Sequence, residues 1–308
     1  MSWRVENAAP ITLLRDLPDG WAQTCVTAPP GWRSREGFLG HEPTPASYTL
    51  HLVAVLREVR RVLRDDGTLW LNLRDSYEPA SPAAFRGTHT QRPGRFLPLA
   101  RGRELVGLPR HVALALHADG WIAHENTIWT QPATARGDAR EYLLLLTKQP
   151  DFFYDARALR EHCGGPRSGW LRFTDRRGEH TQHEQQRGSR CVRRRSCWQP
   201  ADGPLTANVP ARELIERCIL AGTPPKTCGI CGSPWVRDTH PRSGGWRASC
   251  AHINSHGRAL VLDPFAGRGI VGAAAHHADR TFLGIEEHPA TARLTRRRLQ
   301  SITAEARS

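Results

Sequence analysis

The chain has 308 residues, of which 39% are hydrophobic, with a formal net charge of +13 and a pI of about 10.2. That length suffices for one large domain with a hydrophobic core. The sequence has no run of 18 apolar residues and no secretory signal at its N-terminus, so we expect a cytoplasmic protein and exclude a membrane-spanning one. Eight cysteines in such a protein do not indicate disulfides. A chain this basic is typical of nucleic-acid-binding proteins, unless its Arg content reflects compositional bias.

The N-terminal half alternates predicted strands and helices. Short apolar runs predict strands over 23–27, 68–73, 121–129 and 142–148, and apolar residues at helical spacing predict helices over 44–63 and 108–119. Asp65, Asp66 and Gly67 form a predicted turn, and residues 76–104 a predicted long loop.

The amino-acid composition changes after residue 156. Between residues 157 and 195 there are eleven Arg and no Lys, which indicates a disordered linker or a loop-rich insertion that contacts nucleic acid. A helix is predicted over 213–221. A Cys- and His-bearing stretch follows, and then a strand over 259–263, a helix over 270–277, a strand over 281–285 and a helix over 289–301. Alternating strands and helices predict an α/β fold with a largely parallel sheet.

A glycine-rich turn follows the predicted strand 259–263. Gly267 and Gly269 allow a tight turn with exposed backbone amides, and Gly272 lets the next helix pack close to the sheet. The next strand ends in Glu286, which can accept hydrogen bonds from the ribose hydroxyls of an adenosine. This pattern by itself also fits dinucleotide-binding folds and plain helix-packing turns.

The residues before the glycines favour a methyl donor over a phosphate. Pro264 and Phe265 are poor choices for a phosphate cradle, which needs bare backbone. Asp263, at the end of the strand, suits a ligand with an ammonium group. S-adenosylmethionine carries an ammonium and a sulfonium but no phosphate, so the pattern predicts an S-adenosylmethionine site.

DPFAGRG, followed by GIE and Pro289, resembles the DPFAGSG…GIE signature of bacterial amino-directed DNA methyltransferases. Further segments resemble that family in the same order along the chain, namely TCVTAPPGW, GTLWLNLRDSY, LVGLPRHVALALHADGW, IWTQP, REYLLLLTK, FFYD and NVPARELIERCILAGT. The TCVTAPPGW segment resembles the catalytic TSPPYW loop. It precedes the donor motif, which is the circularly permuted order of the β group, in which many members act on cytosine N4.

The resemblance implies a Rossmann-like S-adenosylmethionine-dependent fold that acts on double-stranded DNA. Pro29 and Pro30 would shape the catalytic loop, into which the target base is flipped. The implied donor-binding residues are Asp263, Pro264, Phe265, Ala266, Gly267, Gly269, Glu286 and Asn208.

The catalytic loop departs from the family pattern of Ser or Asp, Pro, Pro, and then an aromatic residue. Here it reads Ala28-Pro29-Pro30-Gly31. The missing polar side chain normally accepts a hydrogen bond from the base amine, and the missing aromatic ring stacks on the base. Each loss costs about 1–3 kcal/mol, or roughly 10 to 10²-fold in rate.

Three hypotheses follow from this departure. In the favoured one, the enzyme methylates a base amine, with the Pro29 carbonyl as acceptor and Trp32 as the stacking ring. In the second, it methylates cytosine C5, with Cys25 as nucleophile, although a core role for Cys25 is favoured. In the third, it is a catalytically silent DNA-binding relative. RNA is a further alternative substrate. Asp75 helps shape the base pocket or caps a helix or turn.

A metal site is predicted from Cys228, Cys231, Cys250 and His252. Two residues separate the first two cysteines, so both sulfurs can face one ion, and the set is typical of structural Zn²⁺. His240 and His256 are alternative fourth ligands. Reduced cysteines in a turn are the alternative to a metal site.

The sequence divides into five predicted regions. These are the N-terminal methyltransferase part (1–156), the target-recognition region (157–207), the donor-binding helix (208–226), the zinc module (227–257) and the donor-binding part (258–308). The excess of Arg indicates a G/C-rich target, because Arg pairs bidentately with guanine. We expect a monomer or a homodimer.

Overall fold

The computed structural model describes the chain in ten segments. They are residues 3–33, 39–75, 105–130, 140–159, 161–162, 191–192, 197–198, 209–238, 245–252 and 256–305. Within them, no helix is long and apolar enough to cross a membrane.

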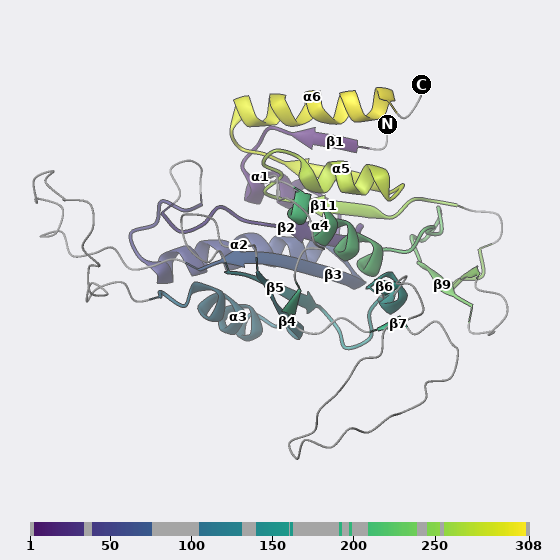
Figure 1. The fold of residues 1–308 in the computed structure, drawn as a ribbon, viewed down its shortest axis with the longest axis horizontal. Coiled ribbons are helices and arrows are strands. Elements are labelled where there is room, and N and C mark those ends of the chain that lie inside the picture. Colours follow the sequence, from purple (N-terminus) through teal and green to yellow (C-terminus); the bar gives the residue numbers. More distant parts are fainter. Residues whose placement is uncertain are drawn as a thin grey trace, which may run out of the picture.

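An eight-stranded sheet forms the centre of the molecule (Figure 1). In spatial order its strands are β1 (Trp3–Glu6), β12 (Thr281–Ile285), β11 (Leu260–Asp263), β2 (Ala22–Thr27), β3 (Leu63–Arg74), β5 (Arg140–Thr147), β4 (Ile122–Thr130) and β8 (Cys197–Trp198). The first five are parallel, β5 runs antiparallel to both of its neighbours, and β8 is parallel to β4. The predicted α/β fold with a mostly parallel sheet is confirmed.

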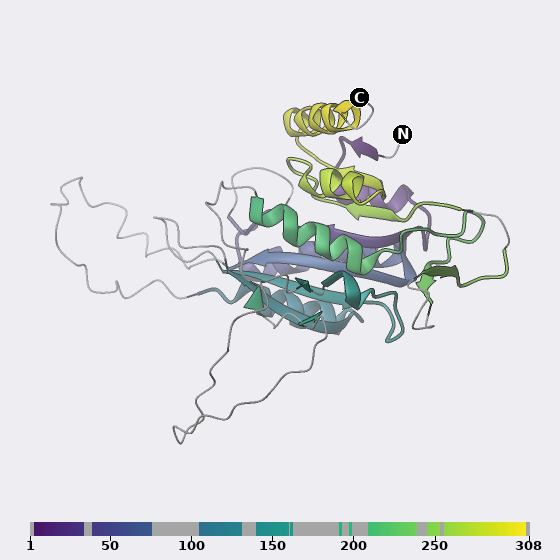
Figure 2. The same ribbon diagram turned by 45° about the vertical axis from the view of Figure 1, so that its right-hand side comes forward.

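Helices cover both faces of the sheet (Figure 2). The helices α1 (Pro10–Asp16), α2 (Pro45–Val62) and α3 (Leu108–Ala118) pack their apolar residues into one core, and α4 (Val209–Gly222), α5 (Ile270–His277) and α6 (Pro289–Glu305) pack theirs into the other. Each core is bounded by the sheet, because side chains alternate between the two faces of a strand. In this doubly wound arrangement the two cores lie on opposite faces of the sheet.

Local sequence explains the two elements that lead into and follow the first loop. All six residues of β2 are buried, as expected for a central parallel strand. The N-terminus of α2 has Pro45 in its first turn and a reciprocal capping box between Thr44 and Ser47. These signals fix where the loop between β2 and α2 begins and ends.

The structure differs from the sequence-based expectation at three places. β1 and α1 were not predicted, because each is too short to show a clear period. The turn predicted at Asp65, Asp66 and Gly67 is wrong, since these residues lie inside β3 where its register with β2 shifts. The loop predicted at 76–104 lies outside the described residues.

Smaller elements lie beyond the central sheet. The antiparallel pair β9 (Trp235–Arg237) and β10 (Trp246–Ala248) belongs to the Cys- and His-bearing stretch. The 3-10 helix η2 (Ala156–Leu159) overlaps the beginning of the Arg-rich region, and the paired short strands β6 (Glu161–His162) and β7 (Cys191–Val192) lie within it. A role of this region in target recognition stays a prediction.

Gly272→Ala tests the predicted close packing of α5 on the sheet. A Cβ at position 272 would lie 2.7 Å from Phe282 Cε1 and 3.0 Å from Leu299 Cδ1, in a closed core. Alanine gains about 1 kcal/mol of helix propensity, but overpacking costs about 1–3 kcal/mol. We expect a net loss of up to about 2 kcal/mol in the free energy of unfolding, measured by urea titration.

Gly31→Ala is the matched control, because its added Cβ would meet nothing within 4 Å. It should change the free energy of unfolding by less than about 0.5 kcal/mol. A Gly272→Ala protein about 1 kcal/mol more stable than the parent would contradict the close packing, because the helix-propensity gain would then be unopposed.

Candidate functional site

Two loops that are far apart in the sequence meet at the carboxyl edge of the sheet. β2 and β11 are parallel neighbours, with Leu262 paired to Cys25. The loops that follow them therefore leave the sheet side by side. The Thr27 hydroxyl donates to Asp263 Oδ1 at 2.6 Å and joins the two strand ends directly.

The Asp263 carboxylate is the buried hub of this junction. Its Oδ1 also accepts the Phe265 backbone N–H at 3.1 Å, and the residue is 2% exposed. Burial raises the pKa of Asp263 to about 7, although both hydrogen bonds act in the opposite direction. Both printed hydrogen bonds go to Oδ1, and no described group donates to Oδ2.

A cavity of about 260 Å³ opens between the two loops. Its wall combines Ala28 and Pro30 of the first loop with Pro264, Phe265 and Gly267 of the second, and it is completed by Pro10, Leu39, Ile285, Glu286, Glu287, His288 and Thr291. The wall is mainly apolar, with Glu286 as one of its few charged residues.

Glu286 is held in place by backbone groups on both sides of it. Its Oε2 accepts the Gly267 N–H and its Oε1 accepts the His288 N–H, each at 2.9 Å. The Asn7 side chain, which follows β1, donates to the Glu286 and Glu287 carbonyls at 2.9 and 2.8 Å. Each carboxylate oxygen keeps a further lone pair that can accept a ligand hydroxyl.

A second cavity, of about 440 Å³, lies on the other side of the first loop. Ala28 lines both cavities, so the segment Ala28–Pro30 forms the partition between them. The wall of the second cavity contains Ala28, Pro29, Gly31, Trp32, Arg33, Tyr48, Asn72, Leu73, Arg74, Asp75 and Glu141.

The partition is fixed by hydrogen bonds from α2 and the chain before it. The Tyr48 hydroxyl, on α2, donates to the Pro30 carbonyl at 2.8 Å, and burial raises the pKa of this phenol, which keeps it protonated as a donor. Trp32 Nε1 donates to the Glu42 carbonyl at 2.9 Å. No described group donates to the Pro29 carbonyl, which therefore stays available to a ligand in the cavity.

Comparison with known proteins shows to which family a chain with this arrangement belongs. The model of a family described as DNA methylase (N6/N4) matches residues 22–297. The Type II methyltransferase M.XycI of Xanthomonas campestris pv. cyanopsidis is 31% identical over 94% of this chain and 85% of its own length. M.Cfr9I of Citrobacter freundii is 29% identical over the same two shares.

The chain belongs to the DNA methylase (N6/N4) family. The resemblance to amino-directed DNA methyltransferases is thereby confirmed, and the protein is a DNA methyltransferase.

Solved structures support the same fold for this methylase. The PvuII DNA methyltransferase (cytosine-N4-specific) matches with a TM-score of 0.57 at 13% identity, over 98% of this chain and 92% of that one. A putative DNA modification methylase of Thermus thermophilus, complexed with S-adenosyl-L-methionine, matches with a TM-score of 0.55 at 22% identity, over 97% and 93%.

The methylase brings four of the predicted donor-site residues into one cavity wall. Pro264, Phe265, Gly267 and Glu286 line the first cavity, and Asp263 directly precedes Pro264 in the chain and binds Thr27. Three predicted donor ligands, Asp263, Ala266 and Gly269, are not part of the wall, and a fourth, Asn208, lies outside the described residues. Ala266 is buried in the core, and Gly269, with a φ of 73°, begins α5.

The first loop also matches the prediction, with the exception of Cys25. Ala28, Pro29, Pro30 and Trp32 all line one or both cavities. Cys25 is 0% exposed in the core, and burial raises the pKa of its thiol well above the ordinary value. A thiolate nucleophile does not fit that position. The hypothesis of C5 methylation through Cys25 is therefore wrong, and the core role that the sequence favoured for Cys25 holds.

Several wall residues were missed by sequence reasoning. His288 could have been found, since it stands two residues after Glu286. Asn72 and Glu141 carry no local signal, because they become neighbours only through the pairing of β3 with β5. Asp75 does accept a hydrogen bond from the Leu108 N–H at the start of α3, as expected of a helix cap, and it also lines the second cavity.

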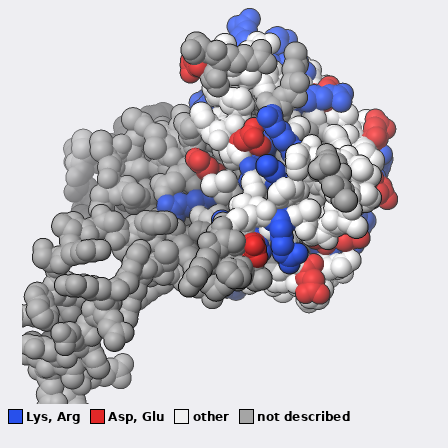
Figure 3. Space-filling model, turned by 90° about the vertical axis from the view of Figure 1, so that its right-hand side faces the viewer, with Lys and Arg blue, Asp and Glu red and all other residues white. Residues whose placement is uncertain are grey.

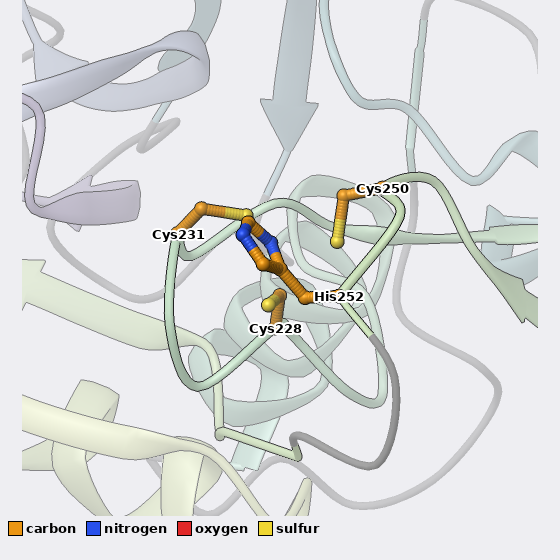
Figure 4. Close-up of side chains that lie close together, drawn as sticks. All are labelled: Cys228, Cys231, Cys250 and His252. Carbon is orange, nitrogen blue, oxygen red and sulfur yellow. The ribbon is translucent and has the colours of Figure 1, made fainter.

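The predicted metal ligands lie together in the methylase. One ligand atom each from Cys228, Cys231, Cys250 and His252 lies within 4.8 Å of every other, and the side chains point toward one another (Figure 4). None of the three cysteines is in a disulfide. His256 packs edge-on against Trp235, and His240 lies outside the described residues.

The Cys and His cluster and the two cavities lie at opposite ends of the strands. Arg64, at the beginning of β3, donates to the Cys231 carbonyl at 3.1 Å, whereas the cavities lie where β3 ends. Arg237 of β9 binds Asp155 through two hydrogen bonds of 2.8 and 2.6 Å. The described surface at this end carries both basic and acidic side chains (Figure 3).

Asp263→Asn tests the buried carboxylate. Asn keeps an Oδ1 acceptor for Thr27 and Phe265 but carries no charge. A folded-state pKa raised to about 7 from 3.8 means that the folded parent loses stability as the pH rises from 3.8 toward 7. The free energy of unfolding of the variant, relative to the parent, should therefore rise between pH 4 and 7, by at most about 1.4 kcal/mol per pH unit.

Asp65→Asn is the matched control, because the Asp65 side chain is 78% exposed. It controls for the loss of one exposed carboxylate. A constant difference between Asp263→Asn and the parent across this pH range would show that Asp263 ionises in the folded protein as it does in the unfolded chain.

Proposed function

We propose that this methylase transfers the methyl group of S-adenosylmethionine to an exocyclic amine of a base flipped out of double-stranded DNA, with cytosine N4 favoured. One observation carries the proposal. Two cavities lie on opposite sides of Ala28–Pro30 and share Ala28 as a wall. A donor in one and a base in the other would meet at this segment.

The chemistry of the first cavity fits the methyl donor. In this proposal Asp263, which precedes the wall residues Pro264 and Phe265, would pair with the ammonium group, and the remaining lone pairs of Glu286 would accept the ribose hydroxyls. The apolar walls from Pro264, Phe265 and Ile285 suit the adenine ring and the sulfonium side chain. When bound, S-adenosylmethionine supplies an electrophilic methyl group. The Thermus structure named above is of a methylase complexed with this molecule.

The second cavity fits a flipped base. The Pro29 carbonyl can accept an N–H of the base amine, and Trp32 and the Arg74 guanidinium border the space that the ring would occupy. The cytosine-N4-specific PvuII enzyme shares the fold, and the motif order resembles the β group; both support N4 over adenine N6. A G/C-rich target and a monomeric or dimeric state remain parts of this proposal, as does a cytoplasmic location.

Methyl transfer is the direct test. The affinity of the purified protein for S-adenosylmethionine is measured, and the protein is then incubated with the labelled donor and, in parallel, unmethylated genomic DNA or total RNA. The nucleic acid is digested to nucleosides for mass spectrometry. We expect N4-methylcytosine. Asp263→Asn should weaken donor affinity on the order of tenfold or more, because a buried charge-assisted hydrogen bond is lost.

Three other outcomes of this experiment separate the alternatives. N6-methyladenine would overturn the choice of base, and label on RNA but not on DNA would overturn the substrate. Tight donor binding without transfer to any DNA would leave the silent DNA-binding relative as the function.

We propose a structural zinc ion in the Cys and His cluster. Three thiolates and one imidazole are the donor set that Zn²⁺ prefers in closed tetrahedral sites, and their clustering within 4.8 Å fits one ion. Four protein ligands leave no open position for a substrate. The ion would hold the β9–β10 pair and the loop around Cys231 against the start of β3.

Zinc content and stability test this site. The protein should bind about one zinc per chain, and Cys231→Ser should lower that content and the melting temperature, because metal binding is coupled to folding. His256→Ala is the matched control, since it lies beside the cluster without belonging to it, and it should keep its zinc. Zinc loss in His256→Ala but not in a His252→Ala protein would reassign the fourth ligand.

A further inference from the structure

The partition between the cavities lacks the polar side chain that its role calls for. Ala28 lines both cavities and offers only a methyl group. An amine that attacks a sulfonium methyl keeps its lone pair free when its N–H groups are held by acceptors. The Pro29 carbonyl can hold one N–H, so a second acceptor must come from elsewhere in the wall.

Asn72 lies next to Ala28 across the sheet. β2 and β3 are parallel and pair Val26 with Trp70 and Thr27 with Leu71. Continued by one residue, this register sets Ala28 beside Asn72, with both side chains on the same face. Both residues line the second cavity.

The orientation of the Asn72 amide is fixed by its neighbours. Its Nδ2 donates to Glu141 Oε2 at 2.7 Å, and Arg74 binds the other oxygen of the same carboxylate. A carboxylate flanked in this way needs a donor, so the NH₂ of Asn72 must face Glu141 and its carbonyl must face away. Glu141 is 7% exposed, which shields this network from water.

The carbonyl oxygen of Asn72 is left without a partner. Oδ1 is buried and accepts no hydrogen bond within the described part of the chain. Most buried side-chain oxygens in folded proteins are hydrogen-bonded, and an orphaned one at a cavity wall points to a ligand that supplies the missing donor.

We propose that Asn72 Oδ1 accepts the second N–H of the target base amine, in place of the loop side chain that Ala28 lacks. Arg74 and Glu141 act as positioning residues that hold the amide in the accepting orientation. This inference rests on the proposed function, because it assigns a contact to the flipped base. In the transfer, the amine nitrogen forms a bond to the methyl carbon, the carbon–sulfur bond breaks with its electron pair left on sulfur, and one amine proton passes to water.

The proposal is tested with Asn72→Ala, Ala28→Ser and the double variant. The substrate is a duplex that contains the target found in the genomic labelling experiment, and kcat and the KM for DNA are measured for each protein. Asn72→Ala should lower kcat by roughly 10 to 10²-fold, with donor affinity and melting temperature close to those of the parent. Adding Ala28→Ser should restore at least part of that loss, because a Ser hydroxyl supplies an acceptor from the adjacent strand.

The rescue separates a base contact from a packing role. A serine on the loop would not repair a defect in the packing of β3, so recovery in the double variant supports the proposal. Asp65→Ala serves as the matched control on the same strand, since Asp65 is exposed at its opposite end, and it should leave kcat unchanged.

Failure of this inference is distinct from failure of the proposed function. A kcat of Asn72→Ala equal to that of the parent overturns this inference but leaves the proposed function standing. The same holds if Ala28→Ser raises kcat tenfold above the parent, because that gain would mean that the parent lacks a second acceptor. An Asn72→Ala defect that Ala28→Ser does not relieve also overturns it. No transfer by either the parent or Ala28→Ser overturns the proposed function and this inference with it.

Discussion

The hydrogen bond from Thr27 to Asp263 is the contact on which the rest of the site depends. It joins residues 236 positions apart at the ends of two adjacent parallel strands. Because it is buried, water does not compete for it, and the two strand ends are held at one separation. The donor turn follows one strand and the Ala28–Pro30 partition follows the other. This contact therefore sets the position of the donor turn relative to the partition. In the proposed function it also sets the alignment of the donor methyl with the base amine.

The same contact explains why a costly buried carboxylate is kept. An unpaired ionised group in the core is strongly unfavourable, and two hydrogen bonds to one oxygen offset only part of that cost. The remaining oxygen and a pKa of about 7 leave Asp263 incompletely satisfied in the ligand-free protein. In the proposed function, the ammonium group of the donor would offset this cost, so that part of the stability lost by burying Asp263 would appear as affinity for the donor.

How much could be predicted from the sequence follows from how local each feature is. The donor turn was predicted almost residue by residue, because strand, glycine turn, helix and Glu286 lie within one βαβ unit. The grouping of the Cys and His side chains was predicted for a similar reason, since Cys228 and Cys231 share one turn, and a metal ion bound by them stays a prediction. Asn72 and Glu141 lie 69 residues apart, and only the β3–β5 register brings them together. β1 was missed as well, although Asn7, just beyond it, fixes the backbone at Glu286.

The position of Asn72 also gives a physical reason why the loop can tolerate alanine at position 28. A polar side chain on the loop must be held by the loop itself, whereas Asn72 stands on a twelve-residue strand and is oriented by Glu141. With the acceptor on the sheet, the loop needs only to keep its backbone in place. Tyr48 does this by binding the Pro30 carbonyl, which leaves the neighbouring Pro29 carbonyl for the base. For this reason, the network on β3 and β5 compensates for the departure from the family pattern at Ala28.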